Sequence, residues 1–298
     1  MQYRLLGKST LSVSEIGFGC MSLGHHDVDN ARLIHHALDQ GINFFDTADL
    51  YEHGQNETTV GKALQTKRSA VIIASKVGNQ WKEDGSGWNW NPGRDYIIAA
   101  VEASLKRLQT DYIDLYQLHG GTMEDPIAET IDAFETLQQQ GKIRYYGISS
   151  IRPNVIREYV NRSHMVSVMM QYSLLDRRPE ETCFPLLLEN NIGVLARGSL
   201  AKGLLLDKPA APYLNYAEGD VAAAAAAIKA HSNPTRGAAQ TALRFVLQQP
   251  AVSSAIVGIR TAAQLEDALR AVQAPALLPE EIAALQQVVP ANTYDQHR

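Results

Sequence analysis

The sequence contains few cysteines. Cys20 and Cys183 are the only two in 298 residues, and their spacing matches no metal-binding pattern such as C-x-x-C. So few thiols are typical of a protein that works in a reducing compartment. We therefore expect a cytoplasmic protein with no metal site. The sequence by itself leaves open a disulfide between the two cysteines.

Long apolar stretches and a surplus of positive charge are also missing. No segment reaches the roughly 20 consecutive apolar residues that cross a bilayer. The N-terminus, MQYRLLGKSTLSVSEIG, lacks the apolar region of a signal peptide. The 27 Lys and Arg residues are outnumbered by 32 Asp and Glu residues, which gives a formal net charge of −5. We therefore expect neither a membrane nor a nucleic acid as partner.

What the chain does contain is a regular alternation of short apolar runs with amphipathic helical patterns. The apolar runs cover residues 16–19, 42–45, 70–75, 112–118, 143–149, 165–171, 192–196 and 252–258, and clear helical patterns cover 27–41, 94–108 and 125–142. Such strands indicate a parallel sheet whose outer face is covered by helices. The pattern predicts an α/β protein, a (β/α)₈ TIM barrel, with residues 1–298 as one domain.

Two further features belong to this fold prediction. A doubly wound open sheet is the alternative, but its G-x-G-x-x-G fingerprint is missing, because Ser22 stands where the third glycine is needed. The stretch YRLLGKSTLSVS, residues 3–14, predicts a β-hairpin that caps the barrel floor.

Two segments interrupt the alternation. Residues 79–93 are predicted to form a long loop that holds all three tryptophans, which either line a pocket or only pack the loop. Residues 207–233 are predicted to begin as a loop and then form one or two helical turns around the alanine run 222–227. Both segments follow strands, so in a barrel both lie on the C-terminal, functional face.

Polar residues follow three consecutive strands, at the barrel end where active sites are built. They are Asp46, Lys76 and His119, and Tyr51 lies in the loop after Asp46. Singly, each has an ordinary structural role: a turn carboxylate, a solvated lysine, a structural histidine and a packing tyrosine. Together they suit proton donation, because a phenol, with its pKa of about 10, needs a nearby ammonium to release its proton near neutrality. Such a group would protonate a developing alkoxide beside a hydride donor.

The remaining strand ends offer a second set of polar groups. Ser149, Ser150 and Gln171 follow the fifth and sixth strands, and either serine is also a candidate cap for the helix that begins near Pro153. Thr261 and Gln264 have capping-box spacing, and Gly258 and Arg260 precede that helix. A helix N-terminus beside a glycine and an arginine is a suitable phosphate site.

The chain resembles the aldo-keto reductase family over about residues 3–290. The similar stretches are RLLGKSTLSVSEIGFGCM, FFDTADLYEHG, ASKVG, EASLKRLQTDYIDLYQLH, GKIRYYGISS, QYSLLDR, IGVLARGSLAKGLL and SAIVGIRTAAQLEDAL. The resemblance implies a (β/α)₈ barrel that reduces aldehydes and ketones with NADP(H). It also implies that Asp46, Tyr51, Lys76 and His119 are the catalytic tetrad, with Asp46 orienting Lys76 and Tyr51 acting as the acid.

The resemblance also assigns the cofactor-binding residues. Ser149, Ser150 and Gln171 would bind the nicotinamide carboxamide, and Gly258 and Arg260 would bind the adenosine 2′-phosphate. The full set is Gly19, Cys20, Met21, Ser149, Ser150, Gln171, Arg197, Gly198, Leu200, Lys202, Gly258, Arg260 and Gln264, of which Gly198, Leu200 and Lys202 lie near the pyrophosphate.

Some positions depart from the family pattern, and other functions stay open. Arg197 stands where many members have the tyrosine that stacks on the nicotinamide, and Ala268 where many have an asparagine near the adenine. Gly120 and Gly121 suggest an open substrate pocket. The alternatives are a cofactor-binding regulatory subunit with slow turnover and a Schiff-base lyase that uses Lys76. The expected partner is a small carbonyl substrate, and the expected assembly is a monomer or small homo-oligomer.

Overall fold

The structure is a computed structural model that describes residues 1–298. At its centre lies a closed barrel of parallel strands. Around the barrel the strands follow one another in the order β10-β11-β12-β3-β4-β5-β8-β9. They are β3 (Ile16–Gly19), β4 (Phe44–Asp46), β5 (Ile72–Val77), β8 (Ile113–Leu118), β9 (Ile143–Ser149), β10 (Ser167–Gln171), β11 (Gly193–Arg197) and β12 (Val252–Gly258). Each predicted apolar run contributes one strand, so the barrel prediction is confirmed and the open-sheet alternative is wrong.

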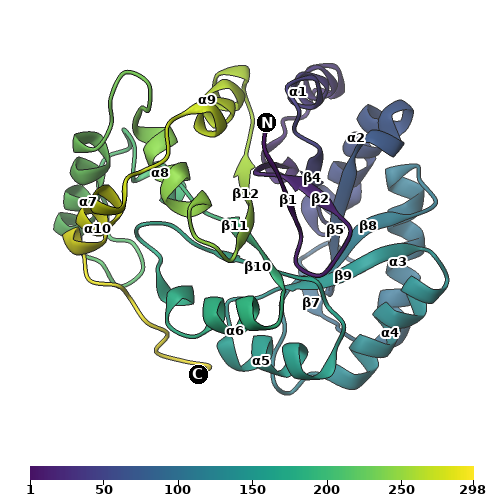
Figure 1. Ribbon diagram of the computed structural model, residues 1–298. Coiled ribbons are helices and arrows are strands. Elements are labelled where there is room, and N and C mark those ends of the chain that lie inside the picture. The colour runs from purple at the N-terminus through teal and green to yellow at the C-terminus, as the bar shows by residue number, and fades with distance from the viewer.

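Helices form an outer layer around these strands (Figure 1). They are α1 (Asp27–Asp39), α2 (Gln55–Leu64), α3 (Arg94–Leu108), α4 (Ile127–Gln139), α5 (Pro153–Arg162), α6 (Cys183–Glu189), α7 (Glu218–Ala230), α8 (Ala238–Leu247), α9 (Ala262–Gln273) and α10 (Pro279–Val288). The main hydrophobic core contains 71 buried residues, whereas a second cluster contains only 10. None of the helices is both long and apolar enough to cross a bilayer.

The small cluster shows how the N-terminus closes the barrel. Strands β1 (Tyr3–Leu5) and β2 (Ser12–Ser14) pair antiparallel, and in Figure 1 this hairpin crosses in front of the barrel strands. Leu6, Leu11 and Val13 of the hairpin pack in one cluster with barrel residues such as Phe44 and Leu115. This burial holds the hairpin over the barrel floor and confirms the predicted cap.

The two irregular segments are more ordered than the sequence predicts. Residues 79–93 contain an antiparallel hairpin, β6 (Asn79–Trp81) and β7 (Trp88–Trp90), so the prediction of a plain loop is wrong. Trp81 faces Trp88 in the register, and aromatic cross-strand pairs stabilise such ribbons. Helix α7 has 13 residues rather than one or two turns, because Val221, Ala224 and Ile228 along it are buried against the domain.

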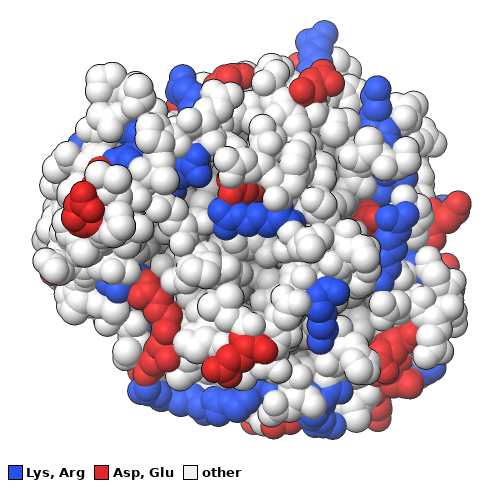
Figure 2. Space-filling model, in the orientation of Figure 1, with Lys and Arg blue, Asp and Glu red and all other residues white.

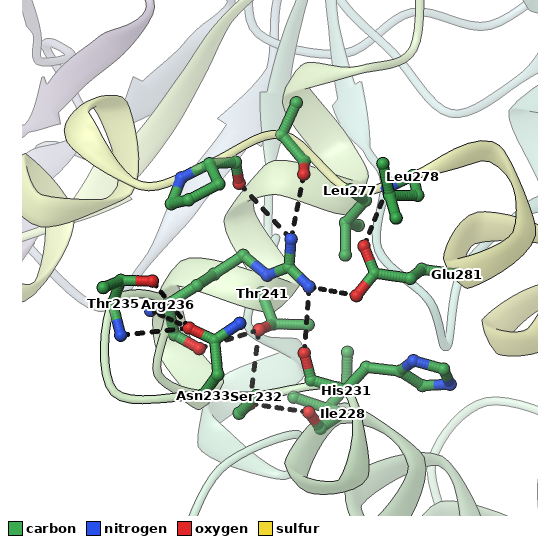
Figure 3. Close-up of polar contacts among 12 residues, drawn as sticks. Ile228, His231, Ser232, Asn233, Thr235, Arg236, Thr241, Leu277, Leu278 and Glu281 are labelled. Atoms are coloured by element: carbon green, nitrogen blue, oxygen red, sulfur yellow. Dashed lines mark hydrogen bonds and ion pairs between the residues drawn. The ribbon is translucent and has the colours of Figure 1, made fainter.

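A buried arginine fastens the C-terminal helix to the rest of the barrel. Arg236, between α7 and α8, is 3% exposed and forms an ion pair with Glu281 of α10. Its guanidinium also donates hydrogen bonds to the carbonyl oxygens of Ala276 (2.9 Å) and His231 (3.0 Å). Figure 3 shows this guanidinium at the centre of the polar contacts.

Acidic and basic side chains are interspersed on the face of the molecule that Figure 2 shows.

Candidate active site

Three neighbouring barrel strands bring Asp46, Lys76 and His119 together. Asp46 ends β4, Lys76 lies near the end of β5, and His119 follows β8. The Lys76 ammonium donates hydrogen bonds to Asp46 Oδ2 (2.7 Å), to the Thr47 carbonyl oxygen (2.8 Å) and to the Tyr51 hydroxyl (3.3 Å). An ammonium has three donors, so all three are used. Lys76 therefore bridges the Asp46 carboxylate and the Tyr51 hydroxyl, and its three hydrogen bonds hold the ammonium in place.

The electrostatics of this group favour a charged lysine. Burial raises the pKa of Asp46, and the neighbouring Lys76 ammonium opposes that rise. Burial would lower the pKa of Lys76, but the Asp46 carboxylate and the Tyr51 oxygen outweigh it, and the pKa of Lys76 is raised. The lysine is therefore an ammonium at neutral pH and a poor nucleophile.

The imidazole ring of His119 packs against the ring of Tyr51. The two rings meet edge to face, with centroids 5.9 Å apart and an interplanar angle of 81°. Burial, together with the charges of Lys76 and Arg197, lowers the pKa of His119 to about 3. The imidazole is therefore neutral at physiological pH and carries one donor and one acceptor nitrogen. Its Nδ1 is buried without a hydrogen-bond partner.

The turn that carries Tyr51 has an unusual backbone. Glu52 (φ 49°), His53 (φ 54°) and Gly54 (φ 84°) are all in the left-handed region, which non-glycine residues enter at an energetic cost. Trp81 of β6 supports this turn, because its indole N–H donates to the Leu50 carbonyl oxygen (3.2 Å) and its ring stacks on His53 with centroids 3.6 Å apart. The hairpin thus holds the loop on which Tyr51 lies.

The tetrad opens into a cavity of about 630 Å³ at the C-terminal end of the barrel. A second cavity of about 400 Å³ extends beside α9. Gly198, Lys202, Ile256 and Gly258 line both cavities, so the two form one elongated site. The first cavity is lined by the four tetrad residues and also by Gly19, Met21, Ser149, Gln171 and Arg197. The second cavity is lined by residues that include Leu200, Gln264 and Ala268.

The lining residues fit an anionic dinucleotide. Lys202 is exposed between the two cavities and has no ion-pair partner. Ser199 Oγ is buried without a hydrogen-bond partner in the same loop. A Cβ at position 258 would lie only 2.7 Å from Ser22 Oγ, so a glycine is needed there. The cavity wall at this position is therefore bare backbone. Unpaired cations, free polar atoms and a bare backbone are what a pyrophosphate-containing ligand requires.

Comparison with known proteins identifies the class of protein. The family model described as "Aldo/keto reductase family" matches residues 15–290. The chain belongs to the aldo/keto reductase family. It is 50% identical to the uncharacterized oxidoreductase YqkF of Bacillus subtilis (strain 168) over the full length of both chains. It is 34% identical to the aldo-keto reductase YhdN of the same organism, over 89% of this chain and 87% of the relative.

Solved structures agree with this assignment. The holo form of aldo-keto reductase AKR11C1 from Bacillus halodurans superimposes with a TM-score of 0.94 at 49% identity, over 100% of this chain and 99% of that chain. The glycerol dehydrogenase AKR11B4 from Gluconobacter oxydans gives a TM-score of 0.87 at 27% identity, over 99% of this chain and 98% of that chain. Aldo/keto reductases are oxidoreductases that act on carbonyl compounds with nicotinamide cofactors, which agrees with the two joined cavities.

Three residues that the sequence placed in the cofactor site, Cys20, Ser150 and Arg260, do not line either cavity of this aldo/keto reductase. Cys20 is wholly buried in the hydrophobic core, where burial raises the pKa of its thiol well above the usual range. Ser150 is buried, and its Oγ accepts a hydrogen bond from the Arg152 N–H (3.2 Å) in the turn before α5. The N-cap of α5 is Arg152 without a side-chain cap, so the predicted serine cap is wrong.

Arg260 lies beside the joined cavities rather than in them. It lines a surface depression of about 500 Å³ together with Arg32 and His36 of α1, which contact Asp29 (3.5 Å) and Glu266 (2.8 Å) of the same depression. The Thr261 hydroxyl accepts from the Gln264 N–H (3.3 Å), as expected for a cap, but the Gln264 side chain accepts from the Arg260 N–H (2.8 Å). The capping box is therefore only half formed, because Gln264 reaches one residue further back.

Several lining residues were missed by the sequence analysis. They are Ser22, Leu50, Asn79, Met169, Tyr213 and Ile256. Tyr213, 8% exposed, lies in the 207–233 segment. This segment falls outside the alternation of strands and helices, so the pattern could not show that Tyr213 lies at the cavity. Met169 and Ile256 belong to strands, where only their position on the inward face distinguishes them from other apolar residues. Of the tryptophans, Trp88 lines the cavity, and Trp90 donates to Asp125 (2.9 Å).

Proposed function

We propose that this aldo/keto reductase reduces aldehydes or ketones to alcohols with NADPH, and that Tyr51 is the general acid. The observation that carries the proposal is the position of Lys76 Nζ, 2.7 Å from Asp46 Oδ2 and 3.3 Å from the Tyr51 hydroxyl. An ammonium at that distance stabilises the phenolate that forms as Tyr51 releases its proton.

Each member of the tetrad then has one task. When bound, the nicotinamide cofactor supplies a hydride to the carbonyl carbon. The Tyr51 hydroxyl gives its proton to the carbonyl oxygen, and Lys76 stabilises the negative charge left on the phenol. Asp46 and the Thr47 carbonyl hold the ammonium in place. His119, neutral because of its low pKa, offers a hydrogen bond to the same carbonyl oxygen rather than a second proton.

The cofactor assignment rests on the distribution of the remaining polar residues. Ser149 and Gln171 line the tetrad cavity and suit the nicotinamide carboxamide. Lys202 lies where the two cavities join and suits the pyrophosphate. NADPH is favoured over NADH because Arg260, which has no ion-pair partner, lies just before α9, where Gln264 lines the second cavity, and a 2′-phosphate needs such a cation. Arg32 lines the same depression but is paired with Asp29 (3.5 Å).

The tetrad geometry argues against the lyase alternative. A Schiff-base lysine must lose its proton to attack a carbonyl. Lys76 makes three hydrogen bonds and has a raised pKa, so it holds its proton. The regulatory-subunit alternative differs from the proposal in rate only, and no contact in the site favours it.

The experiment is a panel of aldehydes and ketones assayed by the loss of NADPH absorbance. We expect turnover with several members of the panel and much less with NADH as donor. A protein that binds NADPH, seen by fluorescence titration, but reduces nothing in the panel would favour the regulatory alternative. Borohydride trapping of a carbonyl compound on Lys76 would instead favour the lyase.

A further inference from the structure

Arg197 is an unpaired cation in the tetrad cavity. It ends β11, its side chain is exposed, and it lines the cavity together with Tyr51 and His119. Unlike Lys76, which is ion-paired to Asp46, Arg197 has no ion-pair partner, and its guanidinium donates no hydrogen bond to the protein. Its charge nevertheless reaches the tetrad, because it contributes to lowering the pKa of His119.

The rest of the cavity wall cannot neutralise Arg197. Asp46 is the single acidic residue that lines the cavity, and its carboxylate is already bonded to Lys76. The cavity therefore carries two excess positive charges, Arg197 and Lys202. In the proposed function Lys202 lies at the pyrophosphate, which leaves Arg197 uncompensated near the reacting group.

Neutral hydrogen-bonding groups lie in the same wall as Arg197. Tyr213 is buried, lines the cavity, and accepts a long hydrogen bond from Gln171 Nε2 (3.4 Å). A planar guanidinium binds a carboxylate through two parallel N–H donors, which an ester or an alkyl group does not reproduce. Arg197 together with these groups suits a second anion in addition to the cofactor phosphates.

We infer that the preferred substrates carry a carboxylate, that is, they are aldehyde acids or keto acids, and that Arg197 binds this carboxylate. The inference rests on the proposed reductase function. The carboxylate takes no part in the chemistry: the carbonyl carbon accepts the hydride, the carbonyl oxygen accepts the Tyr51 proton, and the acid group leaves unchanged on the alcohol. Arg197 therefore acts on substrate choice and orientation.

The test compares 4-formylbenzoate with its methyl ester, which carry the same aldehyde on the same ring. The measured quantity is the ratio of kcat/KM for the acid to kcat/KM for the ester, in wild type and in Arg197→Gln. We expect the ratio to fall by about ten- to a hundred-fold in the variant, the range of a charge-assisted hydrogen bond. Arg197→Lys should keep part of the preference. Any effect of Arg197 on cofactor binding cancels in the ratio.

Lys202→Gln is the matched control, because it removes another cation from the same cavity. It should change both substrates by similar factors. Binding of the product 4-(hydroxymethyl)benzoate in the presence of NADP⁺ gives a readout without turnover, and Arg197→Gln should weaken it by a similar factor to the fall in the ratio.

Several results would overturn the inference. A ratio unchanged by Arg197→Gln, or lowered equally by Lys202→Gln, would show that Arg197 does not bind the substrate anion. If the wild-type protein reduces the ester but not the acid, the inference about the carboxylate is wrong, whereas the proposed reductase function still holds. Failure of wild type to reduce either aldehyde, or any member of the wider panel, would contradict the reductase function itself.

Discussion

The indole ring of Trp81 lies on the imidazole ring of His53, with centroids 3.6 Å apart and an interplanar angle of 23°. His53 belongs to a run of three left-handed residues directly after Tyr51. Such a backbone persists only where the surroundings hold it. The stack, together with the hydrogen bond from Trp81 to the Leu50 carbonyl, therefore connects the β6–β7 hairpin to the position of the Tyr51 hydroxyl.

Trp81→Ala should lower kcat/KM by roughly ten- to a hundred-fold. Without the indole the turn would loosen, and even a small displacement of the Tyr51 hydroxyl from the carbonyl oxygen slows the reaction by such factors. Trp81→Phe keeps an aromatic ring on His53 and loses only the N–H donor, so it should be milder. Steady-state kinetics together with urea unfolding would separate loosening of the turn from general instability. A Trp81→Ala protein with normal kcat/KM would show that the turn holds its shape without the indole.

Tyr51→Phe keeps the ring and removes the proton donor. We expect reduction to slow by at least about 10²-fold, the usual contribution of one acid–base group. NADPH should still bind, since the hydroxyl lies in the tetrad rather than beside the phosphate residues. Single-turnover kinetics and fluorescence titration measure the two effects. Near-normal turnover would remove Tyr51 from the role of acid.

Lys76→Met removes the ammonium that lies 3.3 Å from the Tyr51 oxygen. The negative charge that develops on the phenol would then lose its cation, so the rate should fall by a factor comparable to that for Tyr51→Phe. The dependence of kcat/KM on pH should also change. A slower enzyme whose pH–rate profile matches wild type would mean that Lys76 is not coupled to Tyr51.

Arg260→Ala tests the choice between the two nicotinamide dinucleotides. Loss of a charge-assisted contact to the 2′-phosphate should weaken NADPH binding by about 1.5–3 kcal/mol. NADH has no such phosphate, and its binding should hardly change. Fluorescence titration of both cofactors on both proteins measures the difference. Equal losses would make Arg260 structural, and an unchanged affinity for NADPH would place the phosphate elsewhere.

His119 should remain neutral across the physiological range. Its pKa is lowered to about 3, so above that value the imidazole carries no charge. In the unfolded chain a histidine takes up a proton near pH 6.5. Acidification from about pH 6.5 towards 3 should therefore favour unfolding. NMR of the His119 ring, assigned with His119→Gln, should show no titration above pH 5, and a midpoint near pH 6 would contradict the prediction.

Much of the fold and of the tetrad could be predicted because both depend on local pattern. A strand buried on both faces reads as an apolar run, and parallel strands in a barrel place their C-terminal ends together. Asp46, Lys76 and His119 each follow or end such a run, so their convergence follows once the strands are recognised. Tyr51 follows from its short distance along the chain to Asp46.

The chain by itself therefore determined the eight strands, the hairpin over the floor and the residues at the strand ends. Only the tertiary structure decided that Trp81 supports the Tyr51 turn, that the Cys20 thiol faces the core, and that Arg197 has no partner. The physical reason is that hydrophobic periodicity reports which side of a segment is buried. It carries no information on which distant side chain fills or leaves empty the space beside a given group.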